Sequence, residues 1–202
     1  MDVNANLVRD LRDKTGAGVM DCKKALAESN GDLEQAAIWL REKGIAQAAR
    51  RAGRVASEGS VGAYIHAGGK LGVLVEINCE SDFVAKTPEF QTLAKEIAMQ
   101  IAAQNPRCVR REQLAPDIIE QERQIYAAQS AGKPEQVVAK IVEGKLEKFY
   151  RDVVLEEQAW VRDPNRTIRE LLGEYTGKLG EKIEIRRFSR YQLGENLEGT
   201  AA

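Results

Sequence analysis

The first part of the chain shows apolar residues at the spacing of short α-helices. Ala5, Val8 and Leu11 predict one helix, which should end at "KTGAG" because glycine lets the backbone turn. A second helix is predicted over "MDCKKALAES" and ends at Asn30 and Gly31. Two helices with a glycine-containing turn between them therefore open the chain.

A third helix is predicted to begin after Asp32. Aspartate is a natural N-cap, and Gln35, three positions later, completes a pattern like a capping box. The helix is expected to stop before Gly44. It should turn four apolar side chains inward: Leu33, Ala36, Ala37 and Leu40. A bundle of this size has a small core, which suits a recognition module better than a catalytic scaffold.

Residues 46–58 are predicted to form a basic linker. The segment "AQAARRAGRVASEGS" is rich in alanine and carries Arg50, Arg51 and Arg54. Such a patch can contact RNA, but a solvated linker is the simpler interpretation because the chain is close to neutral. Its formal net charge is −1, from 30 basic and 31 acidic side chains.

The hydrophobic period then changes from that of a helix to that of a strand. "SVGAYIH" and "KLGVLVEINC" alternate between apolar and other positions, and "AGGK" between them indicates a hairpin. The second strand has one apolar face: Leu71, Val73, Val75, Ile77 and Cys79. A helical apolar stripe follows and is expected to cover the sheet: Phe90, Leu93, Ala94, Ile97, Ala98 and Ile101.

Beyond Pro106 the pattern predicts a helical hairpin over about residues 116–151, joined at "GKP". Two sets of residues are expected to face each other across it: Ile118, Ile125 and Tyr126 with Val137, Val138, Ile141 and Leu146. A short strand over "LEEQAWV", a turn at "DPN" and a helix over "TIRELLGEYTGKLG" are predicted next.

The last predicted element is a long alternating strand over "EKIEIRRFSRYQLG". Its buried face is expected to contain Ile183, Ile185 and one side of the run from Phe188 to Leu193. The predicted fold class is α+β, with an antiparallel sheet that packs against helices and carries the helical hairpin. The predicted domains are a three-helix module at 1–45, the linker, a core domain at 59–193 and a frayed tail at 194–202.

Composition places the chain among soluble globular proteins. It has 202 residues, of which 30% are charged and 43% hydrophobic. No apolar run approaches the roughly 20 residues of a membrane helix, and no secretory signal is seen. The three cysteines are expected to be free thiols of a reducing compartment: Cys22, Cys79 and Cys108. We therefore expect a cytoplasmic protein, or one of an organellar stroma or matrix if a transit peptide has been removed.

Residues typical of catalysis are sparse. The one histidine, His66, lies at the predicted hairpin, where an ordinary turn residue is the simpler interpretation. Cys79 falls on the apolar strand face, which favours a core thiol over a nucleophile. "GAYIHAGGKL" lacks the glycine spacing of a phosphate loop, and no strand precedes "TGAGVM". We expect no enzyme activity and no metal site.

One segment does not fit a purely structural interpretation. "NCESDFVAKTPEF" joins a predicted strand to a predicted helix, and Phe83 lies in its acidic, turn-prone part. This phenylalanine is outside both apolar stripes. It is either a core residue folded back under the sheet or a contact for another molecule.

Two motifs carry a resemblance to a known family. One is "LRDKTGAGVMDCKKAL" followed by "NGDLEQAAIWLREKG"; the other is "NCESDFVAK". They resemble translation elongation factor Ts of bacteria and organelles, the guanine-nucleotide exchange factors of elongation factor Tu. "SAGKPEQVVAKIVEGKLEKFY" and "IEIRRFSRYQLGE" also look similar, so the resemblance spans nearly the whole chain. The chain has room for one strand–helix core, as in the short members of that family.

The resemblance implies an exchange function in protein biosynthesis. The protein would bind elongation factor Tu carrying GDP and promote GDP release by disturbing the partner's Mg²⁺ and phosphate site. The contact loop would be Ser81, Asp82, Phe83 and Val84, with Ser81 in place of the family's usual threonine. Phe83 would enter a pocket between helices of the GTPase domain, with Asp82 near the route to the Mg²⁺ site. Mg²⁺ and GDP or GTP belong to the partner, so no cofactor is expected here.

The resemblance also assigns a role to the N-terminal module, which is similar to ubiquitin-associated domains. It would dock on the same GTPase domain through five residues: Leu11, Arg12, Val19, Met20 and Cys22. Leu11 would be shared between the core and the contact. The alternative for Val19 and Met20 is that they only close the three-helix core.

The single core copy implies a homodimer. In the long members the partner contacts are spread over two core copies, so a second protomer would restore them in a 2:2 complex. The strand Glu181–Gln192 is a candidate for the dimer edge, because an unpaired alternating strand invites pairing.

Two other functions stay open at the level of sequence. One is a ubiquitin-associated-like adaptor. The other is a ribosome- or RNA-binding protein that uses six arginines: Arg50, Arg51, Arg54, Arg186, Arg187 and Arg190. The exchange-factor interpretation, which expects neither a membrane nor a direct nucleic-acid partner, explains more of the chain.

Overall fold

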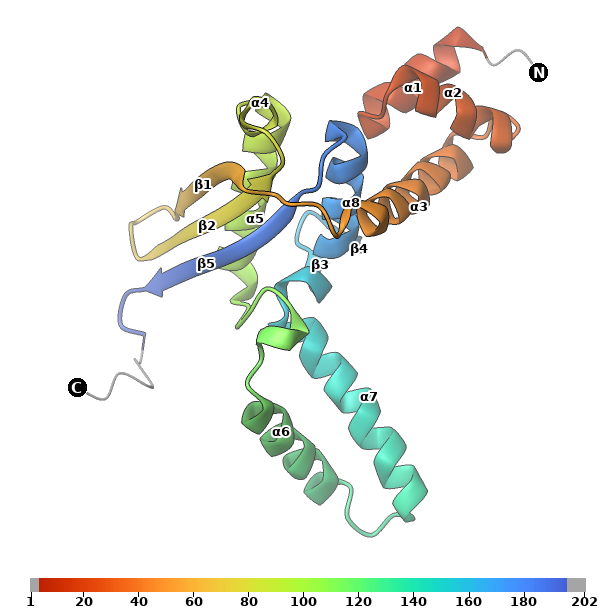
Figure 1. Ribbon diagram of the computed structural model, residues 1–202. Coiled ribbons are helices and arrows are strands. Elements are labelled where there is room, and N and C mark those ends of the chain that lie inside the picture. Colours follow the sequence, from red (N-terminus) through yellow and green to blue (C-terminus); the bar gives the residue numbers. More distant parts are fainter. Residues whose placement is uncertain (1–3, 196–202) are drawn as a thin grey trace. The chain divides into compact units, whose positions relative to one another are not determined.

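The computed structural model describes residues 4–195 (Figure 1). It combines helices with antiparallel strands, so the predicted α+β class is confirmed. Residues 196–202 of the predicted frayed tail lie outside the described residues. Within 4–195, none of the helices has both the length and the apolar character that a membrane crossing needs.

Contacts divide the chain into two compact units, each assembled from separate stretches of sequence. The first contains the described residues up to Ser60, together with Ile77–Leu93 and Arg169–Ile185; the second contains Val61–Glu76, Ala94–Ile168 and the described residues from Arg186 on. The N-terminal helices thus share a unit with Phe83. The domain boundaries expected at residues 45 and 58 stay predictions.

The first three helices contact one another as the sequence predicts: α1 (Ala5–Thr15), α2 (Val19–Glu28) and α3 (Leu33–Arg51). Gly16 ends α1 with a φ of 67°, a conformation that glycine adopts without steric cost. The carboxylate of Asp32 caps α3 by accepting hydrogen bonds from the N–H groups of Glu34 and Gln35. The buried core between the helices is small: Val8, Leu11, Cys22, Ala25, Leu26 and Ala36.

The predicted end of the third helix at Gly44 is wrong, because α3 continues to Arg51. Gly44 lies where α3 meets α8 (Ile168–Leu179) in the first unit: a Cβ atom on it would be 2.9 Å from the carbonyl oxygen of Gly173. The glycine therefore permits a close approach of two helices instead of ending one. Because α3 continues to Arg51, residues 46–51 of the predicted linker are helical.

The main sheet has the strand order β1–β2–β5: β1 (Glu58–Ile65), β2 (Leu71–Cys79) and β5 (Glu184–Gln192). β1 and β2 form the predicted hairpin, where the N–H of His66 donates to the carbonyl of Leu71 at 2.8 Å. In β5, Ile185 is buried, and Ile183 just before it is buried as well. Arg186 and Arg187 are both exposed and both reach Glu76, which interrupts the alternation. It then resumes, because Phe188 and Arg190 are partly buried while Ser189, Tyr191 and Leu193 are exposed, so one side of the run is partly buried as far as Arg190.

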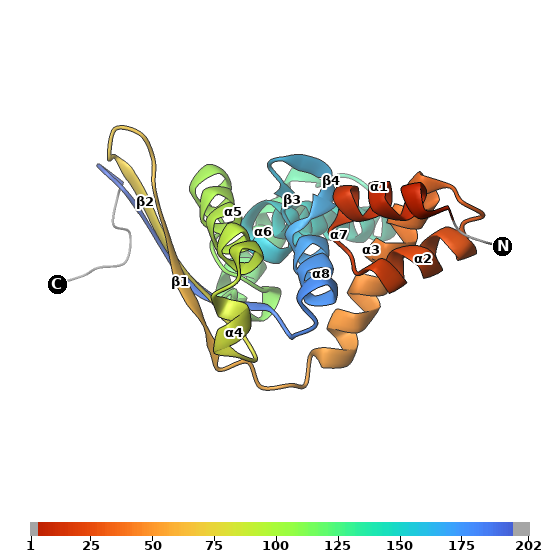
Figure 2. The same ribbon diagram turned by 90° about the horizontal axis from the view of Figure 1, so that it is seen from above.

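The two faces of this sheet differ. Figure 2 shows α5 (Pro88–Gln104) along one face. The predicted stripe of α5 is fully buried, from Phe90 to Ile101, and so are Val73 and Val75 of β2. The strands also carry exposed apolar side chains at five positions up to the end of β5: Val61, Ile65, Leu74, Tyr191 and Leu193.

The second unit carries the predicted helical hairpin of α6 (Pro116–Gln129) and α7 (Glu135–Val153), visible in Figure 1. The apolar cluster at its base contains Cys108, Leu114, Phe149 and Val154. Ile125 and Val137, which were expected to face across the hairpin, remain 48% and 43% exposed, so the pairing expected between them stays a prediction. The packing is concentrated at the base of the hairpin, where Arg111 also binds Glu147 and Glu157.

The segment after α7 differs from the sequence prediction. Strand β3 is only Ala159–Trp160, and it pairs with β4 (Asp163–Thr167). The predicted turn at "DPN" is wrong, because those residues begin β4 and the chain turns at residues 161 and 162. Proline is tolerated there because a sheet of two strands consists of edge strands.

Candidate partner-binding site

The connection between β2 and α5, which we call the Phe83 corner (residues 79–87), presents one large apolar side chain to solvent. Its middle is a single helical turn, α4 (Asp82–Ala85). The side chain of Phe83 is 80% exposed, so it is not the core residue that the sequence left as an alternative. Asp82 and Val84 beside it are partly exposed, whereas Ala85 is buried. The corner therefore offers a ring to another molecule.

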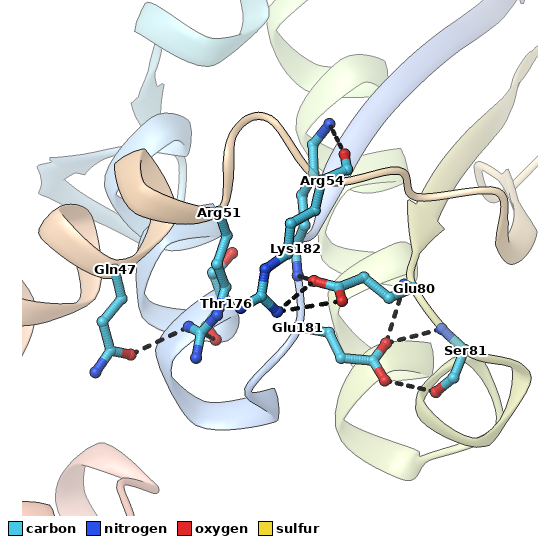
Figure 3. Close-up of polar contacts among 8 residues, drawn as sticks. All are labelled: Gln47, Arg51, Arg54, Glu80, Ser81, Thr176, Glu181 and Lys182. Atoms are coloured by element: carbon cyan, nitrogen blue, oxygen red, sulfur yellow. Dashed lines mark hydrogen bonds and ion pairs between the residues drawn. The ribbon is translucent and has the colours of Figure 1, made fainter.

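Ser81 is fixed through all of its polar groups. Its hydroxyl accepts a hydrogen bond from the N–H of Val84 at 3.4 Å and so caps α4. The same hydroxyl donates to Oε1 of Glu181 at 2.6 Å, and the N–H of Ser81 donates to Oε2 of Glu181 at 2.9 Å (Figure 3). Its carbonyl accepts from the thiol of Cys79 at 3.1 Å. Ser81, the N-cap of α4, therefore has little freedom to rotate.

Glu80 binds the segment that contains Glu181 in return. Oε1 of Glu80 accepts from the N–H of Lys182 at 2.7 Å, while the N–H of Glu80 donates to Oε2 of Glu181 at 3.0 Å (Figure 3). The hydrogen bond from Lys182, and then the charge of Arg54, hold the pKa of the Glu80 carboxyl below its usual 4.5. The end of β2 and the connection between α8 and β5 therefore bind each other through Glu80 and Glu181.

The exposed side of the corner carries an ion pair. Nζ of Lys86 lies 2.7 Å from Oδ2 of Asp82, one helical turn away. The hydrogen bond from Lys86 lowers the pKa of the Asp82 carboxyl, so Asp82 is charged at neutral pH. At its far end the corner is closed by Thr87, whose hydroxyl donates to the carbonyl of Val84 and accepts from the N–H of Phe90.

Cys79 behaves as the core thiol that the sequence favours. It is completely buried, and burial raises the pKa of its thiol to about 11, with the charge of Glu181 adding to the shift. A thiol with so high a pKa is protonated and unreactive at neutral pH.

The five residues assigned to the N-terminal module divide into two groups. Met20 is 74% exposed and Val19 is 43% exposed, both in the first turn of α2, and Arg12 of α1 is exposed as well. Leu11 and Cys22 are completely buried between the helices. They are placed to support the surface that Val19 and Met20 form and are not themselves exposed on it.

The arginines of the expected linker have intramolecular partners. Nη1 of Arg51 donates to the carbonyl of Thr176 at 3.3 Å, and Nη1 of Arg54 lies 3.3 Å from both carboxylate oxygens of Glu80 (Figure 3). Two arginines that the RNA-binding alternative needs are thus engaged in holding the first unit together. The RNA-binding alternative itself stays a prediction.

Sequence reasoning missed one residue of the site, because it placed Glu181 only at the start of the candidate dimer-edge strand and gave it no role at the Phe83 corner. This glutamate is 100 residues from Ser81 in the chain, and no periodic pattern or motif links the two. Among the described residues, no group of histidine, cysteine, aspartate or glutamate is arranged to hold a metal ion. What the site offers is a positioned aromatic ring, an acidic residue beside it and a separate apolar surface on α2.

Comparisons with known proteins identify relatives over almost the full length. Residues 28–195 match the family model described as Elongation factor TS. A protein named Elongation factor Ts from Desulforamulus reducens is 56% identical over 199 residues, covering 98% of this chain and 92% of the relative. Proteins of that name from Thermoanaerobacter sp. and Geobacter sulfurreducens are 57% and 54% identical, covering 97% and 98% of this chain and 97% and 93% of the relatives.

Proposed function

Since this chain belongs to the elongation factor Ts family and is a translation elongation factor, we propose that it acts as the guanine-nucleotide exchange factor of elongation factor Tu. It binds the GDP-bound partner and accelerates the release of GDP. The observation that carries this proposal is the 80% exposure of Phe83 on a corner whose backbone is held from both sides.

Phe83 acts by entering the partner's GTPase domain between helices. A bound nucleotide depends on Mg²⁺ and on a loop of backbone N–H groups around its phosphates. A ring that displaces the helices carrying these parts weakens both, and the charged Asp82 beside it lies near the route to the Mg²⁺ site. Burying one aromatic ring supplies about 2 to 3 kcal/mol, on the order of a hundredfold in an equilibrium constant.

One ring does not supply enough energy for complete nucleotide release, so a second contact is needed. The surface of Val19, Met20 and Arg12 docks on the same GTPase domain and adds binding energy. Methionine adapts to irregular surfaces because its side chain is unbranched and polarisable.

Thermodynamic linkage makes the effect on nucleotide binding reciprocal. If this protein lowers the partner's affinity for nucleotide, bound nucleotide lowers the partner's affinity for this protein by the same factor. Binding of GTP thus releases the exchange factor.

No covalent bond changes in this protein during the cycle, and it is not an enzyme in its own right. Mg²⁺ and the guanine nucleotide are bound by the partner. The three cysteines are buried free thiols, which supports a reducing compartment such as the cytoplasm.

A homodimer in a 2:2 complex completes the proposal. In the second unit, Gly62 of β1 faces Ala94 of α5, so Val61 and Ile65, which alternate with it along the strand, point to the other side of the sheet. Leu74 of β2, between the buried Val73 and Val75, points the same way, and Tyr191 and Leu193 at the end of the edge strand β5 are exposed as well. Contiguous apolar patches of this kind mark interaction sites. Sedimentation at micromolar concentration should show a dimer. A monomer at that concentration would contradict the proposed homodimer.

The function is tested by the release of labelled GDP from elongation factor Tu with and without this protein. The proposal predicts a strong acceleration that saturates with the concentration of this protein. Unlabelled GDP, added in excess after complex formation, should displace this protein from its partner, as linkage requires. Unchanged release at saturating concentration would contradict the proposal.

A further inference from the structure

We propose that Glu181 is a positioning residue for nucleotide exchange: its carboxylate holds the backbone of Glu80 and Ser81 so that Phe83 is presented in the orientation that enters the partner. This inference rests on the proposed function of Phe83. It assigns a role to a residue of the α8–β5 connection, far from the corner in sequence.

The position of Glu181 relative to the corner is the first step. Its carboxylate accepts three hydrogen bonds, from the N–H of Glu80 at 3.0 Å, the N–H of Ser81 at 2.9 Å and the hydroxyl of Ser81 at 2.6 Å. We call this arrangement the glutamate clamp (Figure 3). A carboxylate suits it because both oxygens only accept, and hydrogen bonds to an ionised group are stronger than neutral ones.

The corner depends on the clamp because its own secondary structure is short. Strand β2 ends at Cys79, and α4 has only four residues, too few for a helix that is stable alone. The direction in which Phe83 points is therefore set by the backbone torsions of Glu80 and Ser81. These are the two residues whose N–H groups the clamp holds.

The clamp is itself anchored, so it can hold the corner instead of following it. Outside the corner, Lys182, the next residue, donates its Nζ to the carbonyl of Arg54 at 3.0 Å. Nζ of Lys182 also lies 3.0 Å from Glu184. Without the clamp, the corner would populate several orientations, and only the competent fraction would support exchange.

The test measures GDP release from elongation factor Tu at saturating Glu181→Ala. We expect the maximal stimulated rate to fall about tenfold because the competent orientation becomes a minor one. The matched control is Glu58→Ala: Glu58 is an exposed glutamate whose charge also acts on Lys86 of the corner, and its loss should leave the rate within about twofold.

A double-mutant cycle separates positioning from a general loss of stability. If Glu181 acts through the ring, Glu181→Ala should have no further effect in a Phe83→Ala background. Hydrogen exchange of the Glu80 and Ser81 amides in the unbound protein should also become at least about tenfold faster in Glu181→Ala. If Glu181→Ala reduces folding too far, Glu181→Gln keeps one accepting oxygen and should give a smaller loss in the same cycle.

Two results would overturn the inference while leaving the function of Phe83 intact. One is a wild-type rate for Glu181→Ala when Phe83→Ala is impaired; the other is an equal loss from Glu181→Ala with and without the ring. A wild-type rate for Phe83→Ala itself would instead contradict the proposed function, and the positioning role would fall with it.

Discussion

Phe83 and Met20 are both largely exposed in the first unit, at 80% and 74%, but the chain holds them in different ways. Phe83 lies on a corner whose flanking backbone is hydrogen-bonded to the side chains of Glu181 and Thr87. Met20 lies in the first turn of α2, whose N-cap Gly18 provides no side-chain hydrogen bond. The support of Met20 comes from apolar packing within the module, where Cys22 is buried.

This difference suggests a division of work between the two positions. A ring on a fixed corner can apply force in one direction, which suits the displacement of a partner's helices. A flexible methionine on a packed helix adapts to a surface and contributes affinity. We therefore expect the corner to control the rate of nucleotide release and the α2 surface to control how tightly the complex forms.

The largest effect is expected from Phe83→Ala. The ring's contribution of about 2 to 3 kcal/mol corresponds to a loss on the order of a hundredfold in stimulated GDP release. The thermal midpoint should stay unchanged, because an exposed ring contributes little to the core. Phe83→Leu, which keeps part of the apolar volume, should give an intermediate rate. Equal rates of GDP release for the wild type, Phe83→Ala and Phe83→Leu would show that the ring has no role in exchange.

Removing the α2 surface should have a smaller effect of a different kind. The double variant Val19→Ala, Met20→Ala should raise the concentration needed for half-maximal release about tenfold, as expected for the loss of two apolar contacts. Ile38→Ala, at an exposed apolar position of α3, is the matched control and should behave like the wild type within about twofold. A larger loss from Ile38→Ala than from the double variant would place the docking surface elsewhere.

The contact between α3 and α8 should be sensitive to one methyl group. Gly44→Ala places a Cβ atom 2.9 Å from the carbonyl oxygen of Gly173, and we expect the free energy of unfolding to fall by about 1 to 3 kcal/mol. Gly144→Ala in α7 meets no atom within 4 Å and should raise it by about 0.5 to 1 kcal/mol through helix propensity. Denaturant unfolding of both variants measures whether the free energy of unfolding falls or rises in each. A rise in the free energy of unfolding of both variants would mean that Gly44 is not needed for the close approach of α3 and α8.

The cap of α4 should have a modest effect on stability. Ser81→Ala removes the hydroxyl bonded to Val84 and Glu181 and should cost about 1 kcal/mol, or roughly 2 to 4 °C in thermal midpoint. Ser81→Thr keeps the hydroxyl and should retain wild-type stability. A threonine variant as unstable as the alanine variant would show that the hydroxyl is not what matters.

The smallest effect concerns pH. The pKa of Glu80 is lowered from 4.5 in the folded state, so its stabilising contribution is complete above pH 4.5 and is lost as the pH falls through the folded pKa. The thermal midpoint of the wild type should therefore fall more steeply below that pH than the midpoint of Glu80→Gln. If the thermal midpoints of the two proteins fall in parallel as the pH is lowered, the lowered pKa of Glu80 does not contribute to stability.

The sequence predicted the parts of this molecule that rest on local patterns. The helical stripe from Phe90 to Ile101 and the cap at Asp32 follow from spacing alone, and both are confirmed. The position of Phe83 outside both stripes made its exposure one of two alternatives, and the 80% exposure in the structure decides between them. These features depend on residues that are neighbours in the chain.

The features that the sequence did not predict depend on distant contacts. Gly44 looks like a helix end until Gly173 is known to lie against it. Glu181 looks like a surface residue until the corner it binds is in place. Neither contact leaves a periodic signal, because each joins side-chain or backbone groups that are at least 100 residues apart in the chain.

The division of work between the two positions is tested most directly by titrating elongation factor Tu carrying labelled GDP with Phe83→Ala and with Met20→Ala. The account predicts that Met20→Ala reaches the wild-type maximal release rate at a higher concentration, whereas Phe83→Ala stays below that rate at every concentration. A Phe83→Ala protein that reaches the wild-type maximum, together with a Met20→Ala protein that does not, would contradict it.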